Sequence, residues 1–385
     1  MIIGVLKEVK IGESRIVMTP SEVKELSIMG HQILIQDNAG VLAGFDNQSY
    51  IDASAKIAPD NKSIFSQSDM VVKVKEIVPE EYELLREGQI VFTCLHPAGN
   101  KEEVDELLKA KVIGITAEDS HRYGSPNAEA AGKLGALLGS YHLLSTSGGS
   151  GQSVFGIGGA PAAKALVLGA GIAGKGAAKI LTSLGAYVYI ADINIGILRE
   201  VQYSIQNNIS TMISNRGNIE SVLHEVDLII NCVKWPKHRT DHIIYKKDLK
   251  NMQKGSVIMD VSADVGGAIE TYKPTTHENP TYIVDGVVHY GVDNIPGIAP
   301  HTVSKAYAAS MFPHISSIAN LGLKEAMRRD GFLRRSLTVY NGILTHEETS
   351  VIQGRPFTSP EVVLKYGDTV ELDFAPKATT TKIKK

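Results

Sequence analysis

Short apolar runs alternate with helical patterns through residues 1–125. Between the runs, the apolar spacing predicts helices at Pro20–Leu26 and Pro79–Leu85. Strand and helix alternating in this way indicate a mostly parallel sheet. Runs rich in β-branched and aromatic residues predict strands at Ile2–Leu6, Gln32–Gln36, Met70–Lys75, Ile90–Leu95 and Val112–Ala117.

The same alternation returns after a helical segment in the middle of the chain. Apolar positions at helical spacing predict one helix over Asn127–Leu144, and the glycine-rich stretch 148–159 predicts a loop or hairpin. A last long helical pattern covers Thr302–Arg329. In between, strands are predicted at Ala165–Leu168, Ala186–Asp192, Asp227–Val233, Ser256–Val261 and Tyr282–Val284, with helices that begin near Gly171, Ile195 and Asn218.

The two alternating blocks indicate two domains. A chain of 385 residues is long for a single ordinary core. The simplest partition is a discontinuous domain of residues 1–127 and 301–385, in which substrate binding and catalysis are expected, and a contiguous cofactor-binding domain of residues 128–300. The fold class is therefore predicted to be α/β.

The overall composition is that of a soluble globular protein. The chain is 43% hydrophobic and 21% charged, and its formal net charge of -3 gives no field that would attract nucleic acid or an anionic membrane. Two cysteines, Cys94 and Cys232, cannot form a disulfide framework and fit a reducing compartment. No apolar run approaches the ~20 residues that span a bilayer. We expect a cytoplasmic protein.

A glycine motif follows the predicted strand that ends at position 168 and opens a helix, which is the context that dinucleotide binding requires. Gly169 allows a tight turn, Gly171 lets the backbone approach a diphosphate, and Gly174 lets helix and strand pack closely. The helix N-terminus then offers free N–H groups to the phosphates. The predicted cofactor contacts are Gly169, Ala170, Gly171, Ile172 and Gly174.

An acidic residue completes this motif. Asp192 ends the next predicted strand and follows Gly174 by 18 residues. A carboxylate at this position accepts both ribose hydroxyls of NAD and repels the 2′-phosphate of NADP, so NAD is the predicted cofactor. The competing interpretation is a glycine-rich turn followed by an aspartate that caps a helix. The order of strand, glycines, helix, strand and acid favours NAD binding.

The other domain contains charged residues that suit chemistry on an amino acid, which needs a cationic clamp for a carboxylate and a proton acceptor. Arg15 precedes a predicted helix, and Lys73 and Lys75 alternate along one face of a predicted strand. His96 ends the apolar run 90–95, and Asp264 follows a predicted strand of the cofactor domain. The alternative is that the basic residues are solvated surface charges and that His96 only caps a strand.

Several segments together resemble one enzyme family over nearly the whole chain. The sequence resembles the alanine dehydrogenase branch of the alanine dehydrogenase/pyridine nucleotide transhydrogenase family. That family usually has Pro at the position of Leu6. The matching segments are Ile3–Glu8, Arg15–Pro20, Val72–Glu76, Phe92–His96, Ala165–Gly174, Asp192–Asn194, Asp260–Gly267, Asn294–Gly297 and Leu344–Glu347.

The resemblance implies an activity and residue roles. It implies two Rossmann-like domains with an interdomain active-site cleft, hexameric assembly, and reversible NAD-dependent deamination of L-alanine to pyruvate and ammonia. Arg15 and Lys75 would hold the substrate's carboxylate and carbonyl oxygen, and His96 would be the general acid and base. Asp264 would steer the water and imine chemistry, and Asn294 would contact the cofactor.

The substrate pocket departs from the family pattern. Asn127 stands where alanine dehydrogenases have a Met that walls the substrate pocket, and Ala128 replaces a Ser near the nicotinamide. The loop 234–239 and the segment 301–304 also differ from the family's usual sequences. A repositioned polar group can reverse specificity. The identity of the amino acid is therefore left open.

Three other functions are compatible with the same sequence. An opine-type reductive condensation, resembling saccharopine dehydrogenase or carboxyethylornithine synthase, would use an amino acid's amine in place of ammonia, and the segment His96–Gly99 is similar to the latter. An NAD-binding transhydrogenase subunit generally lacks the Lys75 and His96 pair. A catalytically silent NAD sensor is the third possibility. No histidine spacing matches a known metal site, so no metal is expected.

Overall fold

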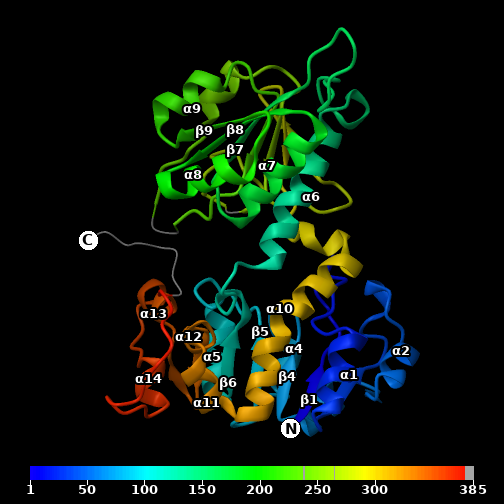
Figure 1. Ribbon diagram of the computed structural model, residues 1–385, viewed down its shortest axis with the longest axis vertical. Coiled ribbons are helices and arrows are strands. Elements are labelled where there is room, and N and C mark those ends of the chain that lie inside the picture. The colour runs from blue at the N-terminus through cyan, green and yellow to red at the C-terminus, as the bar shows by residue number, and fades with distance from the viewer. Residues whose placement is uncertain (237–238, 264, 378–385) are drawn as a thin grey trace. The chain divides into compact units, whose positions relative to one another are not determined.

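The chain folds into two compact α/β units. The first contains residues 1–126 together with the chain from Gly297 onward, and the second contains Asn127–Pro296. Each unit has one mostly parallel sheet, so the predicted fold class is confirmed (Figure 1). The computed structural model describes residues 1–236, 239–263 and 265–377.

The sheet of the first unit has the strand order β15-β14-β6-β5-β4-β1-β2-β3. The pairs from β3 to β6 are parallel, whereas β14 pairs antiparallel with both β6 and β15. Its strands are β1 (Ile2–Val5), β2 (Gln32–Gln36), β3 (Lys56–Ala58), β4 (Met70–Val72), β5 (Ile90–Thr93), β6 (Ile113–Thr116), β14 (Leu337–Tyr340) and β15 (Ile343–Leu344).

Helices cover both faces of this sheet (Figure 1). On one face, Tyr307, Met311 and Ile315 of the long helix α10 pack into a core with Val5 and Phe92 of the strands. A second apolar cluster fills the other face. The helices are α1 (Pro20–Ile28), α2 (Asn47–Asp52), α3 (Asn61–Gln67), α4 (Pro79–Tyr82), α5 (Lys101–Lys109), α10 (Pro300–Leu321), α11 (Leu323–Arg329), α12 (Gly331–Arg335), α13 (Glu347–Gln353) and α14 (Pro360–Val363).

The second unit repeats the same architecture, with the strand order β12-β13-β11-β10-β7-β8-β9. Only the β12–β13 pair, among the described strands, is antiparallel. Two apolar clusters lie on the two faces of the sheet. The elements are β7 (Lys164–Leu168), β8 (Tyr187–Asp192), β9 (Ile209–Ile213), β10 (Leu228–Asn231), β11 (Val257–Asp260), β12 (Thr281–Val284), β13 (Val287–Tyr290), α6 (Pro126–His142), α7 (Ile172–Leu184), α8 (Ile195–Ser204) and α9 (Arg216–Val222).

Two predicted elements differ from those observed. The strand predicted over Met70–Lys75 ends at Val72, and the residues after it form no regular structure. The single helix predicted over Thr302–Arg329 is two helices that break at Gly322, whose φ of 78° is left-handed and cannot continue an α-helix. The apolar spacing alone did not reveal this break, because a glycine at a helical position is tolerated when tertiary contacts support it.

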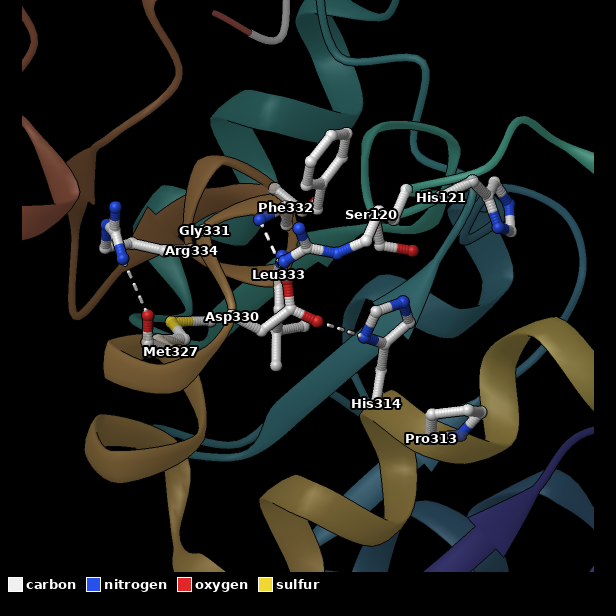
Figure 2. Close-up of polar contacts among 12 residues, drawn as sticks. Ser120, His121, Pro313, His314, Met327, Asp330, Gly331, Phe332, Leu333 and Arg334 are labelled. Atoms are coloured by element: carbon white, nitrogen blue, oxygen red, sulfur yellow. Dashed lines mark hydrogen bonds and ion pairs between the residues drawn. The ribbon is translucent and has the colours of Figure 1, made fainter. Parts of the chain in front are cut away.

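A polar network joins the C-terminal helices to α10 (Figure 2). Asp330 caps α12 by accepting from the Phe332 N–H, at 2.9 Å, and its other oxygen lies 3.1 Å from Nδ1 of His314 on α10. Arg334 of α12 donates to the carbonyl oxygen of Met327 at 3.0 Å. Although burial opposes ionisation, the contact with His314 lowers the pKa of Asp330. This network fixes the C-terminal helices on the first unit.

Candidate active site

In each sheet the strand order reverses at one point, which is where open α/β sheets bind ligands beyond the carboxyl ends of their strands. The reversal lies between β1 and β4 in the first unit and between β7 and β10 in the second. Lys73 and Lys75 directly follow β4, and Gly169 directly follows β7. The two candidate regions therefore occupy equivalent places in their sheets.

Arg15 is buried in the first unit beside an acidic partner. Its side chain is 2% exposed, and its Nε donates to Oε1 of Glu13 at 2.7 Å while Nη2 contacts the other oxygen. Burial opposes the charged forms, but the pairing lowers the pKa of Glu13 and raises the pKa of Arg15. The alternative of a solvated surface arginine is wrong. A guanidinium can bind a carboxylate through two parallel hydrogen bonds, and the binding of a substrate carboxylate by Arg15 stays a prediction.

His96 is paired with two carboxylates. Its Nδ1 lies 2.9 Å from Oε1 of Glu76, and its backbone N–H donates to Oε1 of Glu118 at 2.7 Å. Although about half of the side chain is exposed, the atoms around the imidazole partly desolvate it and oppose its charged form, but Glu118 and then Glu76 raise the pKa of His96 above its usual value. In return, against the effect of burial, His96 lowers the pKa of Glu76 to about 2. The imidazole is thus a base strengthened by its carboxylates, and 49% of its side chain is exposed.

The backbone at His96 has an unusual conformation. Its φ is 45°, which is left-handed, and its carbonyl oxygen accepts from the Gly99 N–H at 3.0 Å. Asn100 Nδ2 donates to the carbonyl of Leu95 at 3.0 Å and closes the same turn. Non-glycine residues adopt this conformation at a cost and cluster at functional sites. The turn fixes the backbone that carries the His96 side chain, just after the end of β5.

Lys73 and Lys75 have different surroundings. Lys73 is 1% exposed, and its Nζ lies 2.9 Å from Oε2 of Glu81, so it is not a solvated surface charge. Lys75 is partly buried and is close enough to Glu76 to lower the pKa of that carboxyl further. Both lysines border a pocket of about 470 Å³ that is also lined by Glu76 and Asn100. Lys75 is therefore the better placed of the two for binding a ligand.

In the second unit, the glycine turn (residues 169–174) has the geometry that a diphosphate site needs. Gly169 has a φ of 86°, and a Cβ on Gly174 would lie 1.8 Å from the Gly169 carbonyl oxygen. A Cβ on Gly171 would meet nothing within 4 Å, so its backbone faces open space. Ala170 completes the turn, and Ile172 begins α7. These residues fit a dinucleotide diphosphate against the helix N-terminus.

Asp192 ends β8 beside the glycine turn. Its Oδ2 accepts from the Ala170 N–H at 2.7 Å, and its Oδ1 accepts from the Asn194 N–H at 2.8 Å. Each carboxylate oxygen has a second acceptor site, so ribose hydroxyls can still bind. The structure therefore adds a role that sequence did not reveal: Asp192 also fixes the turn itself.

Two further predicted residues belong to the second unit, and a third lies outside the described residues. Asn127 is partly buried near the start of α6 and belongs to the second unit. Asn294 belongs to the same unit, is partly buried and has a left-handed φ of 53° just before the short helix Ile295–Ile298. Asp264, predicted to act near the nicotinamide, lies outside the described residues. The roles of these residues stay predictions.

Sequence reasoning missed the acidic partners of the site. Glu13, Glu76 and Glu118 orient Arg15 and His96, yet none was singled out. Glu13 and Glu76 stand close in sequence to the basic residues, which was an available signal. Glu118 is 22 residues from His96, and only the pairing of β5 with β6 brings them together.

The structure also bears on membrane spans and metal sites. Over the described part of the chain, no helix combines the length and apolarity that crossing a bilayer demands. Among the same residues, no cluster of three or more His, Cys, Asp or Glu side chains could hold a metal ion.

Two family models match the chain along most of its length. The N-terminal domain of alanine dehydrogenase/PNT matches residues 4–127, and the C-terminal domain of alanine dehydrogenase/PNT matches residues 135–347. The first match contains Arg15, Lys75 and His96, and the second contains the glycine turn and Asp192.

Relatives and solved structures agree with these matches. An alanine dehydrogenase of Methanococcus maripaludis is 37% identical over 371 residues, which cover 94% of this chain and 100% of that protein. A solved L-alanine dehydrogenase is 38% identical, with a TM-score of 0.86 over 92% of this chain and 99% of the other. A transhydrogenase from Sinorhizobium meliloti shares the fold alone, at 21% identity and a TM-score of 0.75 over 90% of this chain and 99% of that one. The chain belongs to the alanine dehydrogenase/PNT family.

Proposed function

We propose that this protein catalyses the reversible NAD-dependent oxidative deamination of L-alanine to pyruvate and ammonia. The observation that carries the proposal is the His96–Glu76 pair beside Lys75, at the reversal point of the first sheet. An amino-acid dehydrogenase needs a proton acceptor next to a group that holds the substrate's oxygens. The alanine dehydrogenase relatives, with identities of 37% and 38%, support the choice of reaction.

The chain's own groups account for binding and proton transfer. When bound at the glycine turn, NAD supplies the acceptor for the hydride that leaves Cα and converts the amine to an iminium. Arg15 and Lys75 bind the carboxylate and the developing carbonyl oxygen. Water adds to the iminium carbon, and His96 takes its proton at Nε2, because Nδ1 faces Glu76. The carbinolamine then loses ammonia, which leaves the 2-oxo acid.

The carboxylates around His96 suit this role. A charged Glu76 stabilises the imidazolium that forms when His96 takes a proton, as expected for a base oriented by a carboxylate. The same imidazolium can return the proton in the reverse, reductive direction. Asp264 would steer the water, and Asn127 and Asn294 would contact the substrate and the cofactor. We also propose that the enzyme is cytoplasmic and that it forms a homo-oligomer, which the family resemblance implies to be a hexamer.

The decisive experiment follows NADH consumption with a panel of 2-oxo acids, each with ammonia and, separately, with basic amino acids. We expect turnover with pyruvate and ammonia, and little turnover with NADPH. Turnover only with an amino acid as the amine would move the enzyme to opine-type condensation. Binding of NADH without any turnover would overturn the enzymatic proposal and favour a sensor.

A further inference from the structure

The lysine segment (residues 73–78) carries Lys75 and Glu76 but has little regular structure of its own. It connects β4, which ends at Val72, to α4, which begins at Pro79. The ladder of β4 with its neighbours stops before the segment begins, so strand pairing does not hold it. Something else must fix the position of two residues on which the proposed chemistry depends.

Acidic side chains from distant parts of the chain hold the backbone N–H groups of this segment. Glu8 Oε1 accepts from the N–H of Val74 at 2.5 Å and from that of Lys75 at 3.3 Å. Glu103 Oε1 accepts from the Ile77 N–H at 2.7 Å. Glu8 follows β1, and Glu103 lies in α5, so the segment is held from two sides.

The remaining polar groups of the segment are held in the same manner. Glu81 Oε2 accepts from the Val78 N–H at 3.1 Å and also pairs with the ammonium of Lys73. On the opposite side, the Thr93 hydroxyl is 3.1 Å from the carbonyl oxygen of Lys73 and 2.6 Å from that of Lys75. Side chains thus replace the ladder that a strand would have provided.

Two side chains of the segment, Val74 and Ile77, pack into the apolar cores of the first unit, whereas its charged side chains border open space. The pocket of about 470 Å³ borders Lys73, Lys75 and Glu76 as well as Glu8 and Glu103. An open space of this size offers no steric barrier to a small displacement of the backbone. Apolar packing anchors Val74 and Ile77, and the hydrogen bonds to the carboxyl groups fix the backbone between them, which carries Lys75 and Glu76.

We propose that Glu8 is a positioning residue, which holds the backbone of Val74 and Lys75 so that Lys75 and Glu76 face the substrate and His96. Glu103 holds the backbone of Ile77 in the same way. The proposal rests on the proposed function, which gives Lys75 and His96 their roles. Glu8 acts through these residues and does not itself touch the substrate.

Burying the carboxyl groups of Glu8 and Glu103 is energetically unfavourable, which agrees with a positioning role for them. Among the described residues, Glu8 Oε2 and Glu103 Oε2 are buried without a hydrogen-bond partner, which is unfavourable for any carboxyl group. Burial raises the pKa of Glu8 to about 7, against the effect of Lys73, and the pKa of Glu103 to about 9. In either protonation state, Oε1 can still accept the backbone hydrogen bonds.

The first experiment compares Glu8→Ala, Glu8→Gln and Glu102→Ala. The Ala substitution removes the acceptor, and displacing Lys75 should lower kcat/KM for pyruvate by about 10- to 100-fold, with the NADH dissociation constant unchanged. Gln keeps Oε1 as an acceptor, so Glu8→Gln should retain activity within about 3-fold. Glu102 is exposed and borders the same pocket, so Glu102→Ala is the matched control.

Two results would overturn the proposal at this stage. Glu8→Ala as active as Glu102→Ala would show that no positioning occurs, and Glu8→Gln as impaired as Glu8→Ala would show that charge matters and the acceptor does not. If Glu8→Ala fails to fold, as judged by circular dichroism, Glu103→Ala takes its place and should slow turnover through the Ile77 end.

A double-mutant cycle with Lys75→Ala separates positioning from a general structural effect. If Glu8 acts through Lys75 and Glu76, Glu8→Ala should cost clearly less activity in a Lys75→Ala background than in the natural protein, because one of the two groups it positions is already absent. Independent, additive losses would overturn the proposal. Full activity of Lys75→Ala would instead contradict the role that the proposed function gives to Lys75.

Hydrogen exchange tests the positioning role without any reference to catalysis. The amides of Val74 and Lys75 should exchange at least about 10-fold faster in Glu8→Ala than in the natural protein. Their exchange rates should be unchanged in Glu102→Ala. This result is expected even if the substrate panel reveals a different reaction. Unchanged exchange would overturn the positioning role while leaving the proposed function intact.

Discussion

The glycine turn of the second unit and the lysine segment of the first lie at the same kind of position, where the strand order of a parallel sheet reverses. They are held in opposite ways. The glycine turn depends on side chains that are absent, since a Cβ on Gly174 would lie 1.8 Å from the Gly169 carbonyl oxygen. The lysine segment depends on side chains that are present, and Glu8 reaches it from beyond the end of the neighbouring strand β1.

This difference separates a generic site from a specific one. A diphosphate is bound by backbone N–H groups and a helix N-terminus, which any sequence with the right glycines can provide. Binding and protonating an amino acid requires charged side chains in defined positions, and these need partners of their own. The first unit therefore contains a network of carboxylates around Arg15, Lys75 and His96, whereas Asp192 fixes the glycine turn with one side chain.

The largest expected effect comes from removing the proposed base. His96→Ala should lower turnover by about 10²- to 10⁴-fold while NADH still binds, because the proposed cofactor contacts belong to the second unit. The measurement is the steady-state rate together with NADH fluorescence titration. His224→Ala, at an exposed histidine of the second unit, is the control. A fully active His96→Ala variant would contradict the assignment of the base.

The next largest effect concerns the steric reason for a glycine at position 174 of the glycine turn. Gly174→Ala should lower the free energy of unfolding by about 1–3 kcal/mol and abolish tight NADH binding, because the added methyl group collides with the backbone. Gly171→Ala places its methyl group in open space and should keep the stability, while weakening NADH binding. Urea denaturation measures the free energy of unfolding of both variants, and NADH fluorescence titration measures their cofactor binding. Equal stability of the two variants would refute the steric argument.

A pH profile examines the carboxylates around His96. In alanine oxidation, His96 must be neutral to accept a proton, so activity should be lost as the pH falls through its raised pKa. Glu76→Gln removes one cause of that raised pKa, so the acidic limb of kcat/KM should move to lower pH. Glu80→Gln, at an exposed carboxylate of α4, is the control. If the acidic limb of kcat/KM does not move in Glu76→Gln, the contact with Glu76 does not raise the pKa of His96.

The smallest effect concerns cofactor choice. Asp192→Asn removes the negative charge but keeps an oxygen that can accept from the Ala170 N–H, so the glycine turn should stay ordered. The preference for NADH over NADPH should fall by roughly 10-fold, equivalent to about 1.4 kcal/mol. Asp192→Ala should show the same change together with weaker binding of both cofactors. Unchanged selectivity in both variants would remove Asp192 from the cofactor site.

Much of the fold was predictable because its signals are local. Apolar runs marked the central strands, and the glycine motif marked the turn between β7 and α7, since both depend on residues close in the sequence. Two predictions were wrong: the helix predicted to continue through Gly322 ends at Leu321, and the strand predicted to continue beyond Val72 ends there. In both places the pattern of apolar residues continued, but the left-handed backbone at Gly322 ended α10, and hydrogen bonds to the Glu8 side chain replaced the strand pairing after Val72.

The sequence by itself determined the two α/β units, the glycine turn with Asp192, and the candidates Arg15, Lys75 and His96. Only the tertiary structure decided how those candidates are held. The bond from Glu8 to Val74 spans 66 residues, and the bond from Glu118 to His96 spans 22. Such contacts form when parallel strands are brought together in one sheet, and no local spacing of residue types encodes them.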